Sequence, residues 1–170
     1  MIRATITVMA GLLIVAGGVQ AEEKENEHES SVVVELGGGD EWDVRGGAGA
    51  YGPYLALEYE VIEHWLEIET AVAPRFDRGE SEVEFELIFK KPFELSKSLE
   101  FLIGAGPVWV HHAEESPKDS LAGEAIVELV YWPWEDHKVG FFVEPSYSYN
   151  FGQGHEQAVG VTAGLHIGVD

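Results

Sequence analysis

The most constraining feature of this sequence is an alternation of apolar and polar side chains at every second residue, sustained over positions 31–169. In the run 51–61, for example, Leu55, Leu57 and Tyr59 alternate with Ala56 and Glu58. A period of two is typical of strands with one apolar face, and we find no convincing helical period. The alternating runs are 31–37, 51–61, 66–74, 82–90, 99–109, 121–131, 139–149 and 159–169. The sequence therefore predicts an all-β chain with eight strands.

Short stretches of turn-forming residues separate these runs and set the topology. We predict connections at Gly37-Gly38-Gly39-Asp40, Asp77-Arg78-Gly79, Glu115-Ser116-Pro117 and Gly152-Gln153-Gly154. The segment 37–49 is then the longest connection, a loop that would face outside the cell. An even number of strands joined by short turns forms a meander, and closing it removes the exposed edges. We predict an eight-stranded antiparallel up-and-down β-barrel.

Charge separates the two faces of the predicted strands. The apolar face of the seven clear runs carries no charged residue, whereas the opposite face carries glutamates and a single lysine, Lys90. Two architectures give this pattern: a transmembrane barrel with its apolar face in lipid, or a soluble lipocalin-like barrel around an apolar ligand. Small residues on the polar face and aromatic residues at the strand ends favour the transmembrane form. The aromatic belts would comprise Tyr51, Trp109, Tyr147 and Tyr149 at the outer rim and Tyr59, Phe89, Tyr131 and Phe141 at the inner rim.

On these features the chain resembles the small OmpA/OmpX-type outer-membrane barrels over residues 31–169. The alternating end 161–169 looks like the C-terminal strand that the assembly machinery of this family recognises. Two features depart from the family: the chain ends Val169-Asp170 rather than on an aromatic residue, and Lys90 is almost alone among the polar-face glutamates. The resemblance implies an outer-membrane protein whose partners are the lipid bilayer and that machinery.

The first 30 residues predict export. Residues 1–21 have the layout of a signal peptide. Arg3 precedes an uncharged apolar run, and Val19 and Ala21 stand at the two positions that signal peptidase recognises. Residues 22–30 predict a disordered acidic tail because like charges repel one another. The formal charge of −21 argues against a nucleic-acid partner, and the absence of cysteine excludes disulfides and thiolate metal sites.

The glutamates of the polar face suggest one chemical role. If they line a lumen, their charge is relieved by protonation, by water or by bound cations such as Ca²⁺ or Mg²⁺, which prefer oxygen ligands. The alternative is a hydrated polar filling with no transport role, which we favour because eight strands pack tightly. We expect no cofactor and no dedicated metal site. The residues of the cation-attracting lumen would be Glu58, Glu67, Glu69, Glu84, Glu86, Glu128 and Glu144.

Catalytic candidates are sparse, so we predict no enzyme and assign no catalytic residue. Some barrels of this architecture are lipid A acyl hydrolases or acyltransferases, but the deacylase motif is missing after His155. His166 with Ser148 is the one pair worth testing for nucleophilic catalysis. His111 and His112 are adjacent, so on a strand they would point to opposite faces and could not share a metal ion.

These observations leave three functional classes in order of preference. The first is a non-enzymatic outer-membrane barrel with a structural or surface role and an acidic lumen. The second is a soluble periplasmic lipocalin-like barrel, and the third is a lipid A-modifying enzyme. Trp132-Pro133-Trp134 is interpreted as a turn anchored at the membrane interface.

Overall fold

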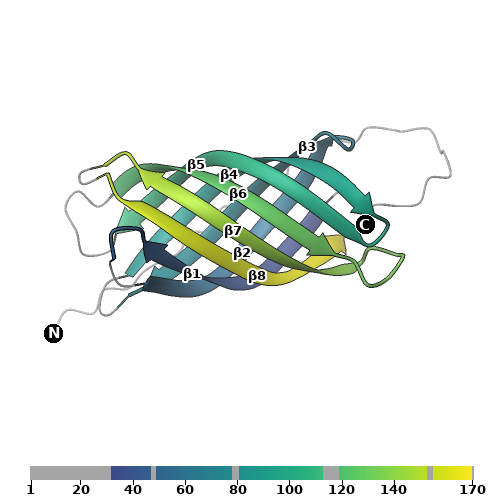
Figure 1. Ribbon diagram of the computed structural model, residues 1–170, viewed down its shortest axis with the longest axis horizontal. Helices are drawn as coiled ribbons and strands as arrows, with labels where there is room; N and C mark the ends of the chain where they lie inside the picture. The colour runs from purple at the N-terminus through teal and green to yellow at the C-terminus, as the bar shows by residue number, and fades with distance from the viewer. Residues whose placement is uncertain (1–31, 47–48, 78–80, 113–118, 153–154, 170) are drawn as a thin grey trace.

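Eight antiparallel strands close into one barrel in the computed structural model, which describes residues 32–46, 49–77, 81–112, 119–152 and 155–169 (Figure 1). Each strand pairs with the next along the chain, and β8 pairs with β1. This confirms the predicted up-and-down barrel. The strands are β1 (Val32–Asp43), β2 (Gly49–Ile62), β3 (Leu66–Phe76), β4 (Ser81–Ser96), β5 (Leu99–His112), β6 (Asp119–Tyr131), β7 (Val139–Asn150) and β8 (Gln157–Val169).

The first strand is longer than the sequence predicts. Residues 37–43 were expected in a loop, but they continue β1 and pair with β2 on one side and β8 on the other. Gly37 faces inward where a side chain does not fit, because a Cβ atom there would lie 2.5 Å from the carbonyl oxygen of Ala163. These glycines therefore serve close strand packing rather than a turn. Strand β4 likewise runs past the predicted end at residue 90, through Pro92 to Ser96.

The two faces of the barrel are arranged as the transmembrane interpretation predicts. Leu55, Phe85 and Val143 point outward and keep 50%, 43% and 40% of their surface exposed, whereas Glu84 and Glu128 point inward and are buried. A soluble barrel around an apolar ligand requires the reverse arrangement, so that alternative is wrong. No helix long and apolar enough to cross a membrane occurs in the described residues.

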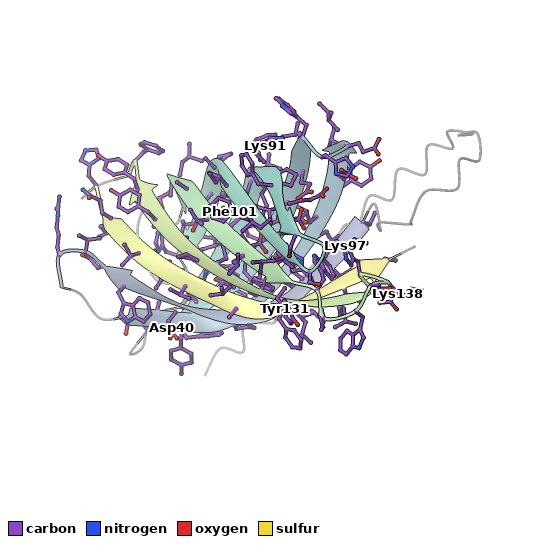
Figure 2. All side chains as sticks on the ribbon, turned by 45° about the vertical axis from the view of Figure 1, so that its right-hand side comes forward. Asp40, Lys91, Lys97, Phe101, Tyr131 and Lys138 are labelled. Atoms are coloured by element: carbon purple, nitrogen blue, oxygen red, sulfur yellow. The ribbon has the colours of Figure 1, made fainter. Side chains whose placement is uncertain are left out.

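The barrel has two distinct ends. The terminal end is where β1 begins and β8 finishes, and the loop end is where β1, β3, β5 and β7 finish. Lys97, Lys138 and Tyr131 lie toward the terminal end and Asp40 toward the loop end (Figure 2). Exposed aromatic side chains occur at both ends, at the positions predicted for the belts. They are Tyr51, Trp109 and Tyr147 toward the loop end and Tyr59, Phe89, Tyr131 and Phe141 toward the terminal end. Tyr149, also predicted for the outer rim, is only partly exposed.

Several predictions concern residues outside those that the structure describes. The signal peptide over 1–21 and the acidic tail over 22–30 are among them, as is the connection Glu115-Ser116-Pro117. These stay predictions.

Candidate functional site in the barrel lumen

The side chain of Lys90 lies at the centre of a charged cluster inside the barrel. Its ammonium nitrogen is 2.6 Å from Glu128 Oε2 and 2.8 Å from Glu58 Oε2. It also forms ion pairs with Glu35, Glu69 and Glu144. With His166, these residues make up what we call the central cluster, and all of them are buried. Seven of the eight strands contribute a member, and β5 contributes Gly104 opposite Lys90.

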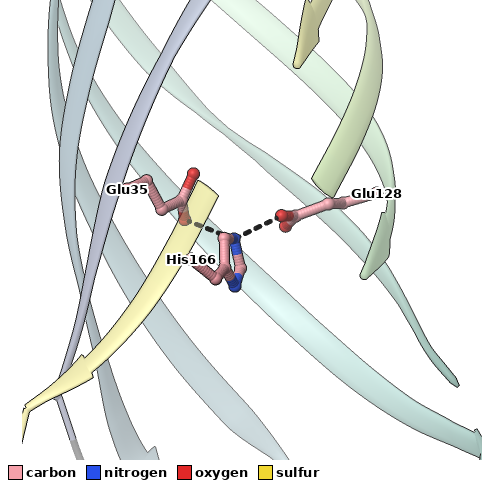
Figure 3. Close-up of side chains that lie close together, drawn as sticks. All are labelled: Glu35, Glu128 and His166. Carbon is pink, nitrogen blue, oxygen red and sulfur yellow. Dashed lines mark ion pairs between the residues drawn. The ribbon is translucent and has the colours of Figure 1, made fainter. Parts of the chain in front are cut away.

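His166 joins two of these carboxylates from the far side of the lumen (Figure 3). Its Nε2 atom is 2.8 Å from Glu128 Oε1 and 3.4 Å from Glu35 Oε1. The Tyr54 hydroxyl donates a hydrogen bond of 2.7 Å to Glu69 Oε1. Buried polar groups need such partners to offset their loss of hydration. Even so, one oxygen of Glu35 has no hydrogen-bond partner among the described residues.

Aromatic side chains border the central cluster toward the terminal end. Trp132 is buried, stacks on His137 with ring centroids 5.3 Å apart, and meets the edge of His166 at 5.7 Å. Gly140 makes room for it, since a Cβ atom there would lie 2.8 Å from the indole ring. Trp132 is therefore not the interface anchor that the sequence predicted, because it turns into the lumen. Trp134 remains exposed, as an anchor would be.

Two groups of side chains have a spacing that could hold a metal ion. Glu35, Glu128 and His166 form one, and Glu35, Glu58, Glu69 and Glu128 form the other. In the second group each carboxylate forms an ion pair with Lys90. The lysine ammonium thus occupies the position that a cation would take. It also contacts two members of the first group, where a second cation would be repelled.

The structure brings only some of the predicted lumenal glutamates together. Glu58, Glu69, Glu128 and Glu144 belong to the central cluster. Glu84 lies further toward the loop end, where it accepts a hydrogen bond of 2.7 Å from Arg75 Nε. Glu86 is buried between these two groups, and Glu67 lies toward the terminal end, where it is only partly buried. The alternation had assigned neither Glu35 nor Arg75 to the site.

The loop end of the lumen widens into a cavity of about 350 Å³, which we call the vestibule. All eight strands contribute to its wall, and its floor includes the Arg75–Glu84 ion pair. Acidic side chains dominate the lining: Glu41, Asp43, Asp77, Glu82, Glu84, Glu124 and Glu156, against Arg75 and His112.

The histidine–serine pair that the sequence suggested does not form. His166 belongs to the central cluster, whereas Ser148 lies in the vestibule and donates a hydrogen bond of 3.0 Å to Glu41. His111 and His112 point to opposite faces, as predicted. His111 contacts Asp119 on the outer face, whereas His112 faces inward between Glu82 and Ser120. The sequence analysis did not identify Ser120 as a candidate site residue. Its contact with His112 crosses the hairpin between β5 and β6, and the sequence does not define the register of that hairpin.

Known structures share this architecture at low sequence identity. The barrel aligns with Neisserial surface protein A at a TM-score of 0.63 and 12% identity, over 81% of this chain and 96% of that one. It aligns with the N-terminal β-barrel domain of Pseudomonas aeruginosa OprF at a TM-score of 0.56 and 16% identity, over 81% and 98%. Its fold is that of the small outer-membrane barrels. No protein-family model and no curated protein sequence matches the chain.

The outer-membrane barrel fold explains the facing of the strands but assigns no activity, because one fold supports many functions. The shared fold therefore indicates the architecture alone, and any chemistry depends on the side chains inside the barrel.

Proposed function

We propose that this chain is a small integral protein of the outer membrane with a structural or surface role. Its apolar outer face, with Leu55, Phe85 and Val143 exposed, would contact the lipid, and its final strand would be read by the assembly machinery. The loop end would face outside the cell, since the terminal end of such barrels lies in the periplasm. The observation that carries this proposal is an outer face of exposed apolar side chains around an interior that holds the buried charged residues.

We propose further that the centre of the lumen is sealed and takes no part in catalysis. Five carboxylates at the centre of the lumen form ion pairs with the chain's own cation, Lys90, so this cation already occupies the space between them. Trp132 and Phe142 close the space beside it, and both are buried. The glutamates would then hold the strands together rather than conduct cations.

Two experiments test these proposals separately. Membranes washed with carbonate or urea should retain the protein, and the folded barrel should migrate differently on a gel before and after heating. Release by the wash would contradict a membrane-spanning barrel. The heat-modifiable protein, inserted in a planar bilayer, should give no steady current, and a stable cation-selective current would contradict the sealed lumen.

A further inference from the structure

A second group of side chains, at the loop end, has the arrangement of a nucleophilic hydrolase. We propose that Glu82 and His112 in the wall of the vestibule, together with Ser120, which contacts His112 and Asn150 of that wall, form a site that hydrolyses carboxylic esters. This goes beyond the structural role proposed above, which assigns no chemistry to the vestibule. The central cluster contributes nothing to it, because that cluster lies deeper in the lumen.

The three side chains contact one another in the order that such catalysis requires. The Ser120 hydroxyl oxygen is 3.2 Å from His112 Nε2, and His112 Nδ1 is 3.0 Å from Glu82 Oε2. The histidine thus uses its two ring nitrogens for two different partners. With a carboxylate accepting from Nδ1–H, Nε2 is left as the acceptor for the serine proton. Both distances lie at or near the range of a nucleophile–base–acid chain in a structure without substrate.

The barrel itself positions these residues. Glu82, His112 and Ser120 lie on the neighbouring strands β4, β5 and β6, where Glu82 is paired with His112 and Val110 with Ser120. Glu82 and His112 both line the vestibule. Because strands of a closed barrel are rigid, they hold such a group more precisely than a loop would.

Asn150 of β7 places a donor beside the serine. Its Nδ2 atom donates a hydrogen bond of 2.9 Å to Ser120 Oγ. Its Oδ1 atom accepts a hydrogen bond of 2.8 Å from the backbone nitrogen of Gly152, which fixes the direction of the amide. Because the Ser120 oxygen accepts this hydrogen bond, its own proton is free to point toward His112 Nε2, so Asn150 is a positioning residue for the serine.

No other described histidine has both a carboxylate and a serine hydroxyl as partners. His166 contacts two carboxylates and no hydroxyl, and His111 contacts Asp119 on the outer face. Ser148 contacts a carboxylate and no histidine. Among the described histidines, His112 alone joins a carboxylate to a hydroxyl.

The vestibule also restricts the substrate. Its volume of about 350 Å³ suits a small molecule, and its lining residues lie at the loop end of the strands. The carboxylates of Glu41, Asp43 and Glu124 line the same wall and would repel an anionic ester. We therefore assign the site to small neutral or cationic esters rather than to phosphorylated lipids.

The reaction needs only water as a second substrate. Ser120 Oγ attacks the ester carbonyl carbon while its proton passes to His112 Nε2. The carbon–oxygen bond to the alcohol then breaks, and His112 returns the proton to the leaving oxygen. A water molecule next attacks the acyl group on Ser120 with His112 as base, which releases the carboxylic acid and restores the serine. Glu82 is a positioning residue that orients the imidazole.

Covalent labelling tests the nucleophile directly. The full chain, folded in detergent micelles and checked by heat-modifiable migration, is treated with a neutral fluorophosphonate and digested for mass spectrometry. We expect one adduct, on Ser120, and a loss of at least about 100-fold in labelling rate in Ser120→Ala and His112→Phe. Ser146→Ala is the matched control, since that serine also faces the lumen but contacts none of the described histidines, and it should label like the wild type. Absence of an adduct on Ser120 in the folded protein would overturn the proposal.

Turnover then tests the substrate class and the positioning residue. An ester with a trimethylammonium group should be hydrolysed at least about 10-fold faster than the same ester with a carboxylate, given the charge of the wall. Glu82→Gln should lower kcat at least about 100-fold while KM changes less than about twofold, because Glu82 acts through His112. Equal hydrolysis by the wild type and Ser120→Ala would show that the observed activity does not come from this site and would overturn the proposal.

Discussion

The central cluster and the vestibule are built from the same residue types on the same strands, yet they differ in access to water. In the central cluster, Lys90 and its carboxylates are buried, and every ion pair lies inside a closed shell of side chains. In the vestibule, His112 keeps 18% and Glu82 29% of its side-chain surface exposed. The difference teaches that acidic lumenal residues can have opposite roles within one barrel.

Burial decides which role each group has. A charge removed from water needs a close partner of opposite charge, so the role of the carboxylates around Lys90 is to stabilise the fold through their ion pairs. His112 lines the open vestibule, and its hydrogen-bond partner Ser120 is only partly buried, so both differ from the fully enclosed groups around Lys90.

Removing the central cation should have the largest effect. We expect Lys90→Met to reduce the free energy of unfolding by about 3–5 kcal/mol, because it leaves several buried carboxylates without their positive partner. Urea titration of the protein in lipid vesicles, followed by tryptophan emission, measures this change.

Two variants provide the comparison for Lys90→Met. Lys91→Met removes the next charge along β4, which points outward and donates a hydrogen bond to the His64 carbonyl oxygen, so its effect should be small. Arg75→Met removes the cation at the vestibule floor, where water reaches the remaining Glu84 more easily, so its effect should be smaller than that of Lys90→Met. Equal losses for Lys90 and Arg75 would contradict the distinction between the two regions.

The lipid-facing side should tolerate charge less well than the vestibule. We expect Leu55→Arg to reduce the free energy of unfolding in vesicles by about 2–4 kcal/mol, because an arginine in mid-membrane loses its hydration. Ala50→Arg, at the wall of the vestibule, is the matched control and should cost much less. The same urea titration compares them, and an equal tolerance at both positions would contradict the proposed orientation of the barrel in lipid.

Much of the fold follows from the alternation alone. The outward facing of Leu55 and the inward facing of Glu84 are consequences of period two once the barrel closes. The extension of β1 through residues 37–43 was missed because glycines in a row usually indicate a turn. Here close packing against β8 requires them.

Less of the candidate site could be predicted, because it depends on contacts between distant positions. Lys90 and Glu35 are 55 residues apart and meet only across the closed barrel. Trp132 turns inward because Gly140 leaves space for its ring, which no local pattern reveals. Ser120 and His112 are eight residues apart, but their contact needs the register of β5 and β6.

The smallest predicted effect concerns Glu86, which lies between the two regions. Its side chain is buried, and the structure gives it an ion pair with none of the described residues. An unpaired carboxylate in that position opposes folding, so Glu86→Gln should raise the free energy of unfolding by about 1 kcal/mol. Glu128→Gln is the matched control and should lower it, because Glu128 contacts both Lys90 and His166. The sign of the change thus distinguishes a carboxylate that holds the barrel together from one that the closed lumen merely contains.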